Sequence, residues 1–294
     1  MNQEWTHIPI MAAEIAELLL INPSGVYVDG TLGLGGHTKY FLSHLAADSR
    51  ILGFDKDEEA LQMAQERVAD SRLKAYHKSY TQAPEVLREL GIAGADGALF
   101  DLGLSSYQLD NPARGFSIMG NGPLDMRFDL QNPLSAAVIV NTWPMAELER
   151  ILKDYGEERN YTKIALAIMK ARKDAPLETT EQLKKVVESV CPRYGKTHPA
   201  TQTFQALRIA CNQELQTVEE VLRSLAGIVR PGGRAAVLTF HSLEDRLVKN
   251  HFKLLAKEGN WKLVNKHALA PSYEEVRQNR RARSAKLRVI ERIN

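Results

Sequence analysis

A glycine-rich tract near the N-terminus, Val26–His37, constrains the fold of this chain more than any other feature. A short run of β-favouring residues ends in Asp29, four glycines follow, and an amphipathic helix pattern begins around Tyr40. Glycine permits positive φ angles and lets the backbone approach a ligand closely, while free N–H groups at a helix start favour a carboxylate or phosphate. The tract predicts a strand, a tight turn and a helix N-terminus, and with them a nucleotide-like cofactor on a parallel α/β sheet.

The type of cofactor depends on residues around this loop. Its glycines are not spaced as a clean G-x-G-x-x-G, so a tight turn without a ligand remains an alternative. Asp29 would repel a pyrophosphate but suits a cationic, amino-acid-like ligand. A second strand pattern ends at Asp55, where an acid can accept both hydroxyls of a ribose. With a Pro-Gly-Gly turn before a late strand, the pattern resembles the class I AdoMet-dependent methyltransferases; a nicotinamide-dependent enzyme is the alternative.

The order of elements predicts two domains. Strand patterns alternate with helix patterns through the first hundred residues, which is typical of a mostly parallel, Rossmann-like sheet with helices on both faces. At Ser106 this alternation stops, and a long Gly-, Pro-, Asn- and Asp-rich loop leads into three amphipathic helix patterns. We therefore predict an AdoMet-binding α/β domain of residues 1–105 and 200–294, with an inserted helical substrate-recognition domain of residues 106–199. The predicted strands are 26–29, 50–55, 73–77, 97–101, 234–240, 261–264 and 285–293.

Composition limits the class of protein. The 294 residues are 44% hydrophobic and 25% charged, as in soluble globular proteins. The first residues are polar, no apolar segment follows them, and no apolar run is long enough for a bilayer, so we expect neither a signal peptide nor a membrane partner. Cys191 and Cys211 are isolated, which predicts neither a disulfide framework nor a Cys-based zinc site and suggests a reducing cytoplasm. Because the net charge is only +2, local clusters must indicate any nucleic-acid partner.

Two segments follow strands at the edge that faces the ligand crevice in open α/β sheets. The first starts at Asp101 and contains Ser105. In amino-group methyltransferases a polar residue here often holds the target amine, although Asp101 is equally suited to capping a turn. The second starts at His241, a candidate general base. Ser242 as an N-cap with Asp245 at N3 is an equally good interpretation of that segment.

Candidate RNA contacts lie in the long loop and near the C-terminus. Arg114 beside an exposed Phe116 would suit a stacked base near a phosphate, and Asp125 and Arg127 follow in the same loop. The alternative is that Phe116 is a core anchor and Arg114 a solvated charge. Six basic residues between positions 277 and 288 flank the last predicted strand, as phosphate contacts or as a solvated charge run. They are Arg277, Arg280, Arg281, Arg283, Lys286 and Arg288.

Several tracts in order along the chain together resemble the bacterial ribosomal RNA small subunit methyltransferase H family, also called MraW. The resemblance covers nearly the whole chain, and tracts in register are far more specific than one glycine loop. The tracts are His7–Ile10, Asp29–His37, Asp101–Ser106, Gln108–Asp110, Arg114–Ser117, Pro123–Arg127, Tyr155–Glu158, His198–Thr201, Phe204–Ile209, Phe240–Arg246 and Arg283–Arg288.

The resemblance implies a class I fold and AdoMet-dependent methylation of the N4 amino group of a decoding-centre cytosine in 16S rRNA of the small ribosomal subunit. It implies no metal and leaves a homodimer open. By similarity, the cofactor contacts are Gly35, Gly36, His37, Asp55, Tyr80, Asp101 and Gln108. The family usually has Phe where this chain has Tyr80 and Ile118. The first difference keeps an aromatic ring, whereas the second removes one from the loop.

The implied reaction is an in-line displacement at a sulfonium methyl group, in which positioning supplies much of the acceleration. The lone pair of cytosine N4 is conjugated into the ring, so the enzyme must orient the amine and accept a proton. The base must also leave its stack. Candidates for the amine contact are Asp101, Ser105, Ser106, Asp125 and His241, without a ranking. Two other functions remain: a nicotinamide-dependent oxidoreductase, and a non-catalytic RNA-binding or assembly factor.

Overall fold

The chain folds into two compact units in the computed structural model, which describes residues 9–192 and 198–294. The first, which we call the α/β unit, takes in the chain up to Gly103 and from Leu215 onward; the second, the helical unit, is Leu104–Glu214. We expected the insertion to end at residue 199, but α10 (Thr201–Asn212) belongs to the helical unit. Its apolar face shares the core of the preceding helices. His7, part of one family tract, lies outside the described residues.

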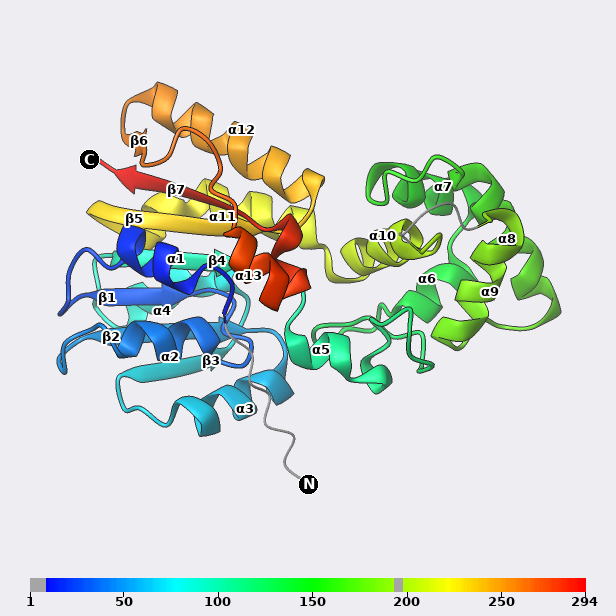
Figure 1. Ribbon diagram of the computed structural model, residues 1–294, viewed down its shortest axis with the longest axis horizontal. Helices are drawn as coiled ribbons and strands as arrows, with labels where there is room; N and C mark the ends of the chain where they lie inside the picture. Colours follow the sequence, from blue (N-terminus) through cyan, green and yellow to red (C-terminus); the bar gives the residue numbers. More distant parts are fainter. Residues whose placement is uncertain (1–8, 193–197) are drawn as a thin grey trace. The chain divides into compact units, whose positions relative to one another are not determined.

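A seven-stranded sheet forms the centre of the described α/β unit, with helices on both faces (Figure 1). Its order is β3-β2-β1-β4-β5-β7-β6, parallel from β3 to β5, with β7 antiparallel to both of its neighbours. The strands are β1 (Val26–Asp29), β2 (Arg50–Asp55), β3 (Leu73–His77), β4 (Ala95–Asp101), β5 (Val229–Thr239), β6 (Trp261–Leu263) and β7 (Lys286–Arg292). The chain changes direction across the sheet between β1 and β4, and ligands bind at the carboxyl ends beside such a switch point.

The predicted strands are confirmed, with one difference at β5. We expected this strand to begin after the Pro-Gly-Gly turn, but it begins at Val229, which pairs with Ala95. The register shifts between Ala95 and Gly97, so the Pro-Gly-Gly segment bulges out of the ladder and the strand continues beyond it. Proline has no N–H to donate to a ladder, and a bulge accommodates it.

Side-chain alternation along the strands builds a core on each face of the sheet. Tyr27, Ile51 and Leu99 are buried together with α1 and α2. Val28 and Phe100, one residue along their strands, are buried on the other face with α4, α11 and α12. The helices of this unit are α1 (Ala12–Leu19), α2 (Gly36–Leu42), α3 (Glu58–Val68), α4 (Ala83–Glu89), α11 (Glu214–Ile228), α12 (Ser242–Glu258) and α13 (Tyr273–Gln278).

The helical unit has a separate core, to which Leu148, Ile164, Leu183 and Leu207 contribute. The predicted capping box at Thr179 is present, with its side chain accepting from the N–H of Gln182. The helices are α5 (Ser106–Asp110), α6 (Ala136–Thr142), α7 (Met145–Asp154), α8 (Tyr161–Asp174), α9 (Thr180–Val190) and α10.

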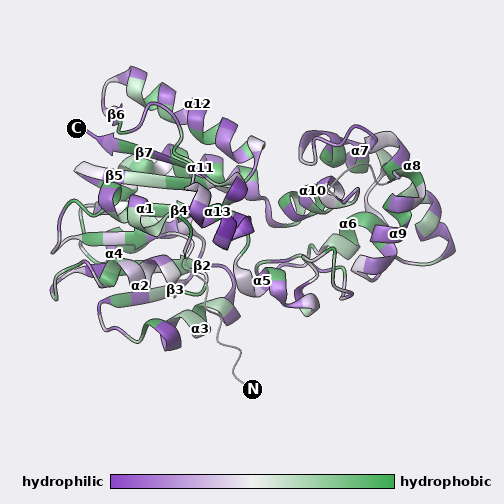
Figure 2. Ribbon diagram, in the orientation of Figure 1, coloured by the Kyte–Doolittle hydropathy of each residue, from purple (hydrophilic) through white to green (hydrophobic). Residues whose placement is uncertain are grey.

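Hydropathy is arranged as these cores require. Figure 2 shows hydrophobic colour along the central strands and hydrophilic colour over α13. Within the described residues, no helix combines the length and the apolar composition that a bilayer crossing needs.

Candidate active site

The glycine-rich loop joins β1 to α2 at the carboxyl edge of the sheet. Gly35 is the N-cap residue of α2 and has φ +75°, in the left-handed region that favours glycine. Gly30 approaches the sheet closely, because a Cβ atom there would lie 2.5 Å from Cδ1 of the Phe100 ring. Both positions therefore need glycine to let the loop run tightly over the ends of β1 and β4.

Asp29 holds this loop together from beneath. It is 2% exposed. Oδ2 accepts a hydrogen bond from the Thr38 hydroxyl at 2.7 Å, and Oδ1 accepts one from the Thr31 N–H at 3.2 Å. Burial raises the pKa of Asp29, and the bond from Thr38 opposes that rise. These contacts give Asp29 a structural role in tying the loop to α2, where the sequence suggested a contact with a cationic ligand.

Asp55 at the end of β2 is bound to the same loop. Its Oδ2 accepts from the Gly33 N–H at 2.7 Å and its Oδ1 accepts from the Asp57 N–H at 2.9 Å. A carboxylate oxygen has more than one lone pair, so both oxygens retain capacity for the hydroxyls of a ribose. Burial raises the pKa of Asp55 to about 6, against the lowering effect of the two N–H bonds.

This raised pKa predicts a pH-dependent stability. Between 3.8, the ordinary value, and about 6, folded Asp55 keeps its proton while the unfolded chain has released it. Unfolding then releases a proton, so the free energy of unfolding falls as pH rises through this window. We expect Asp55→Asn to reduce the loss of Tm between pH 4 and pH 7 by roughly 2–4 °C. Thermal denaturation at both pH values measures this, with the exposed Asp48→Asn as control; identical pH dependence in the two variants would contradict it.

Asp101 at the end of β4 presents a buried acceptor. Oδ2 lies 3.5 Å from Nδ1 of His37, whereas Oδ1 is buried and has no hydrogen-bond partner. The backbone N–H donates to the Thr31 hydroxyl at 2.7 Å, which joins β4 to the glycine loop. Burial raises the pKa of Asp101 to about 6; His37 lowers it, while Asp29 and Glu244 raise it. An unpartnered buried carboxylate oxygen is costly, and such groups are typical of functional sites.

Tyr80 lies beyond β3, in a short 3-10 helix (Tyr80–Gln82). Its ring contacts Phe100 edge to face, with centroids 5.5 Å apart at 63°. Composition and spacing alone would not have selected this residue, since one aromatic after an edge strand carries no functional signal. The structure brings it into contact with the ring that lies under the glycine loop.

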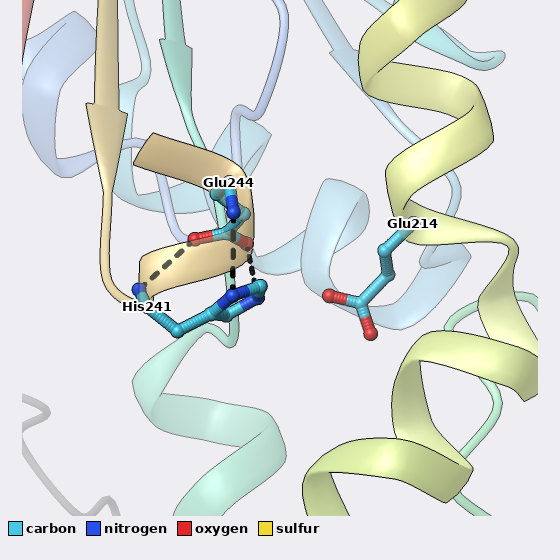
Figure 3. Close-up of side chains that lie close together, drawn as sticks. All are labelled: Glu214, His241 and Glu244. Atoms are coloured by element: carbon cyan, nitrogen blue, oxygen red, sulfur yellow. Dashed lines mark hydrogen bonds and ion pairs between the residues drawn. The ribbon is translucent and has the colours of Figure 1, made fainter. Parts of the chain in front are cut away.

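His241 is the N-cap residue of α12, so our suggestion of Ser242 with Asp245 was wrong by one residue. Its Nδ1 accepts from the Glu244 N–H at 3.4 Å, and Nε2 lies 3.0 Å from Glu244 Oε1 (Figure 3). Glu244 in turn accepts from the N–H groups of Phe240 and His241. Within the described residues, Nε2 is buried and forms no hydrogen bond, while the bonds between Glu244 and the backbone and ring of this segment hold the end of β5 to the start of α12.

The helical unit uses its predicted site residues internally. Ser105 and Gln108 form a capping box at the start of α5. Phe116 is 6% exposed and joins the core, so the premise of an exposed aromatic was wrong. Arg114 is also buried, and it donates to the carbonyl oxygens of Arg127 and Phe128.

The same holds for the next two loop candidates. Asp125 accepts two bonds from the Arg127 guanidinium, at 2.9 and 2.7 Å, and Arg127 also donates to the carbonyl oxygens of Leu130 and Asn132. These contacts shape the loop before α6. In the α/β unit, by contrast, Arg280 and Arg283 are exposed.

The model of the MraW methylase family matches residues 4–293. The chain belongs to this family. It is 57% identical over 290 residues to the ribosomal RNA small subunit methyltransferase H of Elusimicrobium minutum (strain Pei191), covering 98% of this chain and 99% of that protein. The protein of the same name from Geobacter sp. (strain M21) is 43% identical over 311 residues, covering 99% of this chain and all of the other. The predicted family is confirmed, and with it the predicted class of enzyme, a methyltransferase.

Solved structures give a more distant likeness. The fibrillarin of Aeropyrum pernix, with natively bound S-adenosyl-L-methionine, matches with a TM-score of 0.43 at 11% identity, over 95% of this chain and 73% of that chain. The sequence relatives decide the family. A methylase family replaces the nicotinamide-dependent alternative.

Proposed function

We propose that this member of the family transfers the methyl group of AdoMet to the N4 amino group of a decoding-centre cytosine in 16S rRNA, acting on the small ribosomal subunit in the cytoplasm. The observation that carries the proposal is the unpartnered Oδ1 of Asp101, buried at the end of β4 beside the glycine loop. The names of the sequence relatives support small-subunit rRNA as the substrate.

The residues at the carboxyl edge fit AdoMet. Asp55 has lone pairs left for a ribose, the backbone of Gly35 and Gly36 suits the methionine carboxylate, and the ring of Tyr80 suits the adenine. Among the other family contacts, His37 and Asp101 lie at the same edge of the sheet, and Gln108 belongs to the capping box of α5 in the helical unit. When bound, AdoMet supplies a methyl group on a positive sulfur that leaves as a neutral thioether.

Asp101 is the best candidate for the contact with the target amine. An ionised carboxylate accepts a hydrogen bond from N4–H, which turns the N4 lone pair toward the methyl group. N4 forms the new bond to carbon, and its proton passes to Oδ1. Two other candidates already form hydrogen bonds: the Ser105 hydroxyl caps α5, and both oxygens of Asp125 hold Arg127. His241 Nε2 is also buried without a hydrogen-bond partner in the described part of the chain, but it lies 3.0 Å from the Glu244 carboxylate, whereas Asp101 is tied to the glycine loop through Thr31.

The basic segment before β7 is our candidate RNA surface. β7 begins at Lys286, which pairs with Thr239 at the carboxyl end of β5, so the preceding Arg280 and Arg283 follow the same edge of the sheet as Asp101. Both are exposed, whereas Lys286 and Arg288 are paired with Asp245. We therefore assign phosphate contacts to Arg280 and Arg283 and leave Arg288 to the fold.

Removing these charges should weaken RNA binding without sequence preference. We expect the double variant Arg280→Ala, Arg283→Ala to reduce the slope of log K against log salt by roughly 1 to 2. With fewer phosphate contacts, RNA binding releases fewer counterions. Binding to small subunits over a salt series measures this. Arg88→Ala is the control, since Arg88 is exposed in the last turn of α4 at the opposite edge of the sheet. An equal slope for both variants would count against the surface.

The function is tested by transfer of labelled methyl from AdoMet to small subunits purified from cells that lack this enzyme, with product nucleosides identified by mass spectrometry. We expect N4-methylcytidine at a single position. Label at another nucleoside would overturn the substrate. RNA binding that is independent of AdoMet, with no label transferred, would support the non-catalytic assembly factor instead.

A further inference from the structure

His37 is fixed between a backbone carbonyl and Asp101. Its Nε2 lies 3.0 Å from the carbonyl oxygen of Ile10, and the side chain is buried. A carbonyl oxygen only accepts hydrogen bonds, so Nε2 must carry the proton of that bond. The orientation of the ring then leaves Nδ1 as the nitrogen that faces Asp101, at 3.5 Å from Oδ2.

A hydrogen bond between Nδ1 of His37 and Oδ2 of Asp101, which lie 3.5 Å apart, needs one further proton. A neutral His37 protonated at Nε2 has a lone pair on Nδ1, and an ionised Asp101 has only lone pairs on Oδ2, so the two atoms would repel. The contact becomes favourable when a proton lies between them, on the ring or on the carboxyl group. The charged groups that act on Asp101 are His37, Asp29 and Glu244.

We propose that His37 is a positioning residue for Asp101: protonated on both nitrogens, it donates through Nδ1 to Oδ2, so that Asp101 stays ionised and offers Oδ1 alone to the target amine. The assignment of the amine rests on the proposed function, whereas the shared proton is a property of the free protein. After methyl transfer the N4 proton goes to Oδ1, and the ring proton on Nδ1 remains in place.

The carbonyl that orients His37 has its own support. Met11, the next residue, has φ +55° as the N-cap residue of α1, and its N–H donates to Glu275 Oε1 of α13 at 2.7 Å. Glu275 therefore holds the segment that carries the Ile10 carbonyl. Replacing Glu275 should therefore disturb the hydrogen bond between the Ile10 carbonyl and His37 while leaving the histidine side chain itself in place.

The protonation state is measured directly on the free protein. Selective labelling of histidine with 15N and NMR at pH 7 should show both ring nitrogens of His37 protonated, and Asp101→Asn should convert the ring to the neutral form protonated at Nε2. A neutral His37 in the unchanged protein, or a ring protonated at Nδ1 alone, would overturn the inference. Because this readout needs no RNA, failure of the proposed substrate leaves it intact.

Activity gives the second readout. We expect His37→Gln to lower kcat by about 10- to 100-fold at pH 7 with KM for the small subunit unchanged, and to move the acid limb of the pH profile upward by about one unit, since His37 lowers the pKa of Asp101. His44→Gln, an exposed histidine just beyond α2, should leave rate and profile unchanged. Glu275→Leu should shift the acid limb in the same direction by less. A loss of kcat in His37→Gln with no shift of the profile would indicate a merely structural role and overturn the proposal.

Discussion

Asp101→Asn should lower the rate of methyl transfer to the small subunit by about 10²- to 10⁴-fold, the range that a positioned proton acceptor contributes. The amide keeps the size of the carboxylate but cannot take the N4 proton, and it has no charge with which to orient the amine. Single-turnover transfer from labelled AdoMet isolates this step.

Two comparisons separate this loss from a folding defect or a binding defect. Asp48→Asn makes the same chemical change at an exposed position of the α/β unit and should retain full activity. Asp101 is also among the AdoMet contacts that the resemblance implies, so calorimetric titration must measure cofactor binding of the Asp101 variant, and transfer is then compared at saturating AdoMet. If the variant bound AdoMet and transferred methyl at the normal rate, the acceptor would have to be sought elsewhere.

Phe100→Ala should lower the free energy of unfolding of the α/β unit by about 3–5 kcal/mol, the usual cost of deleting a fully buried ring. Phe100 is 0% exposed on β4, and its ring touches both Tyr80 and the space that Gly30 leaves open. The cavity would thus open directly beneath the glycine loop and beside Tyr80. Urea unfolding followed by fluorescence or circular dichroism measures the change.

A matched aromatic truncation provides the control. Tyr273 at the start of α13 is 78% exposed, and Tyr273→Ala should change stability by no more than about 0.5 kcal/mol. Phe100→Leu should recover much of the loss, since it refills part of the cavity. Equal effects of the Phe100→Ala and Tyr273→Ala substitutions would show that the packing under the loop contributes little.

The α/β unit was predictable because its signals are local. Each parallel strand is a short apolar run that ends in a polar residue, as at Asp29, Asp55 and Asp101, and parallel strands bring those ends to one edge. The roles of Tyr80 and His37 could not be inferred from local sequence. They depend on contacts with Phe100 and Ile10, which lie in other parts of the fold. Only the family resemblance pointed to Tyr80.

The errors of prediction have physical causes. Two pairs have the spacing of a capping box at the start of α12: His241 with Glu244, and Ser242 with Asp245. N-cap propensity favours serine over histidine, but the contacts between His241 and Glu244 make His241 the N-cap residue. Phe116 lies in an irregular loop with no periodicity from which burial could be inferred. The predicted domain boundary at residue 199 was wrong because α10 packs in the core of the helical unit. The amphipathic pattern of a helix does not show whether its apolar face will cover a sheet or pack against other helices.

The interruption of the α/β unit has a consequence for how the chain is made. β4 pairs with β5, yet the whole helical unit, Leu104–Glu214, is synthesised between them. Until β5 leaves the ribosome, β4 is the unpaired margin of a half-built sheet, rich in buried apolar residues and open to pairing with other chains. Prompt collapse of the helical unit shortens the effective distance between the two strands and so lowers the entropic cost of closing the sheet. We therefore expect an insertion that folds early to limit the time in which nascent chains can aggregate through this margin.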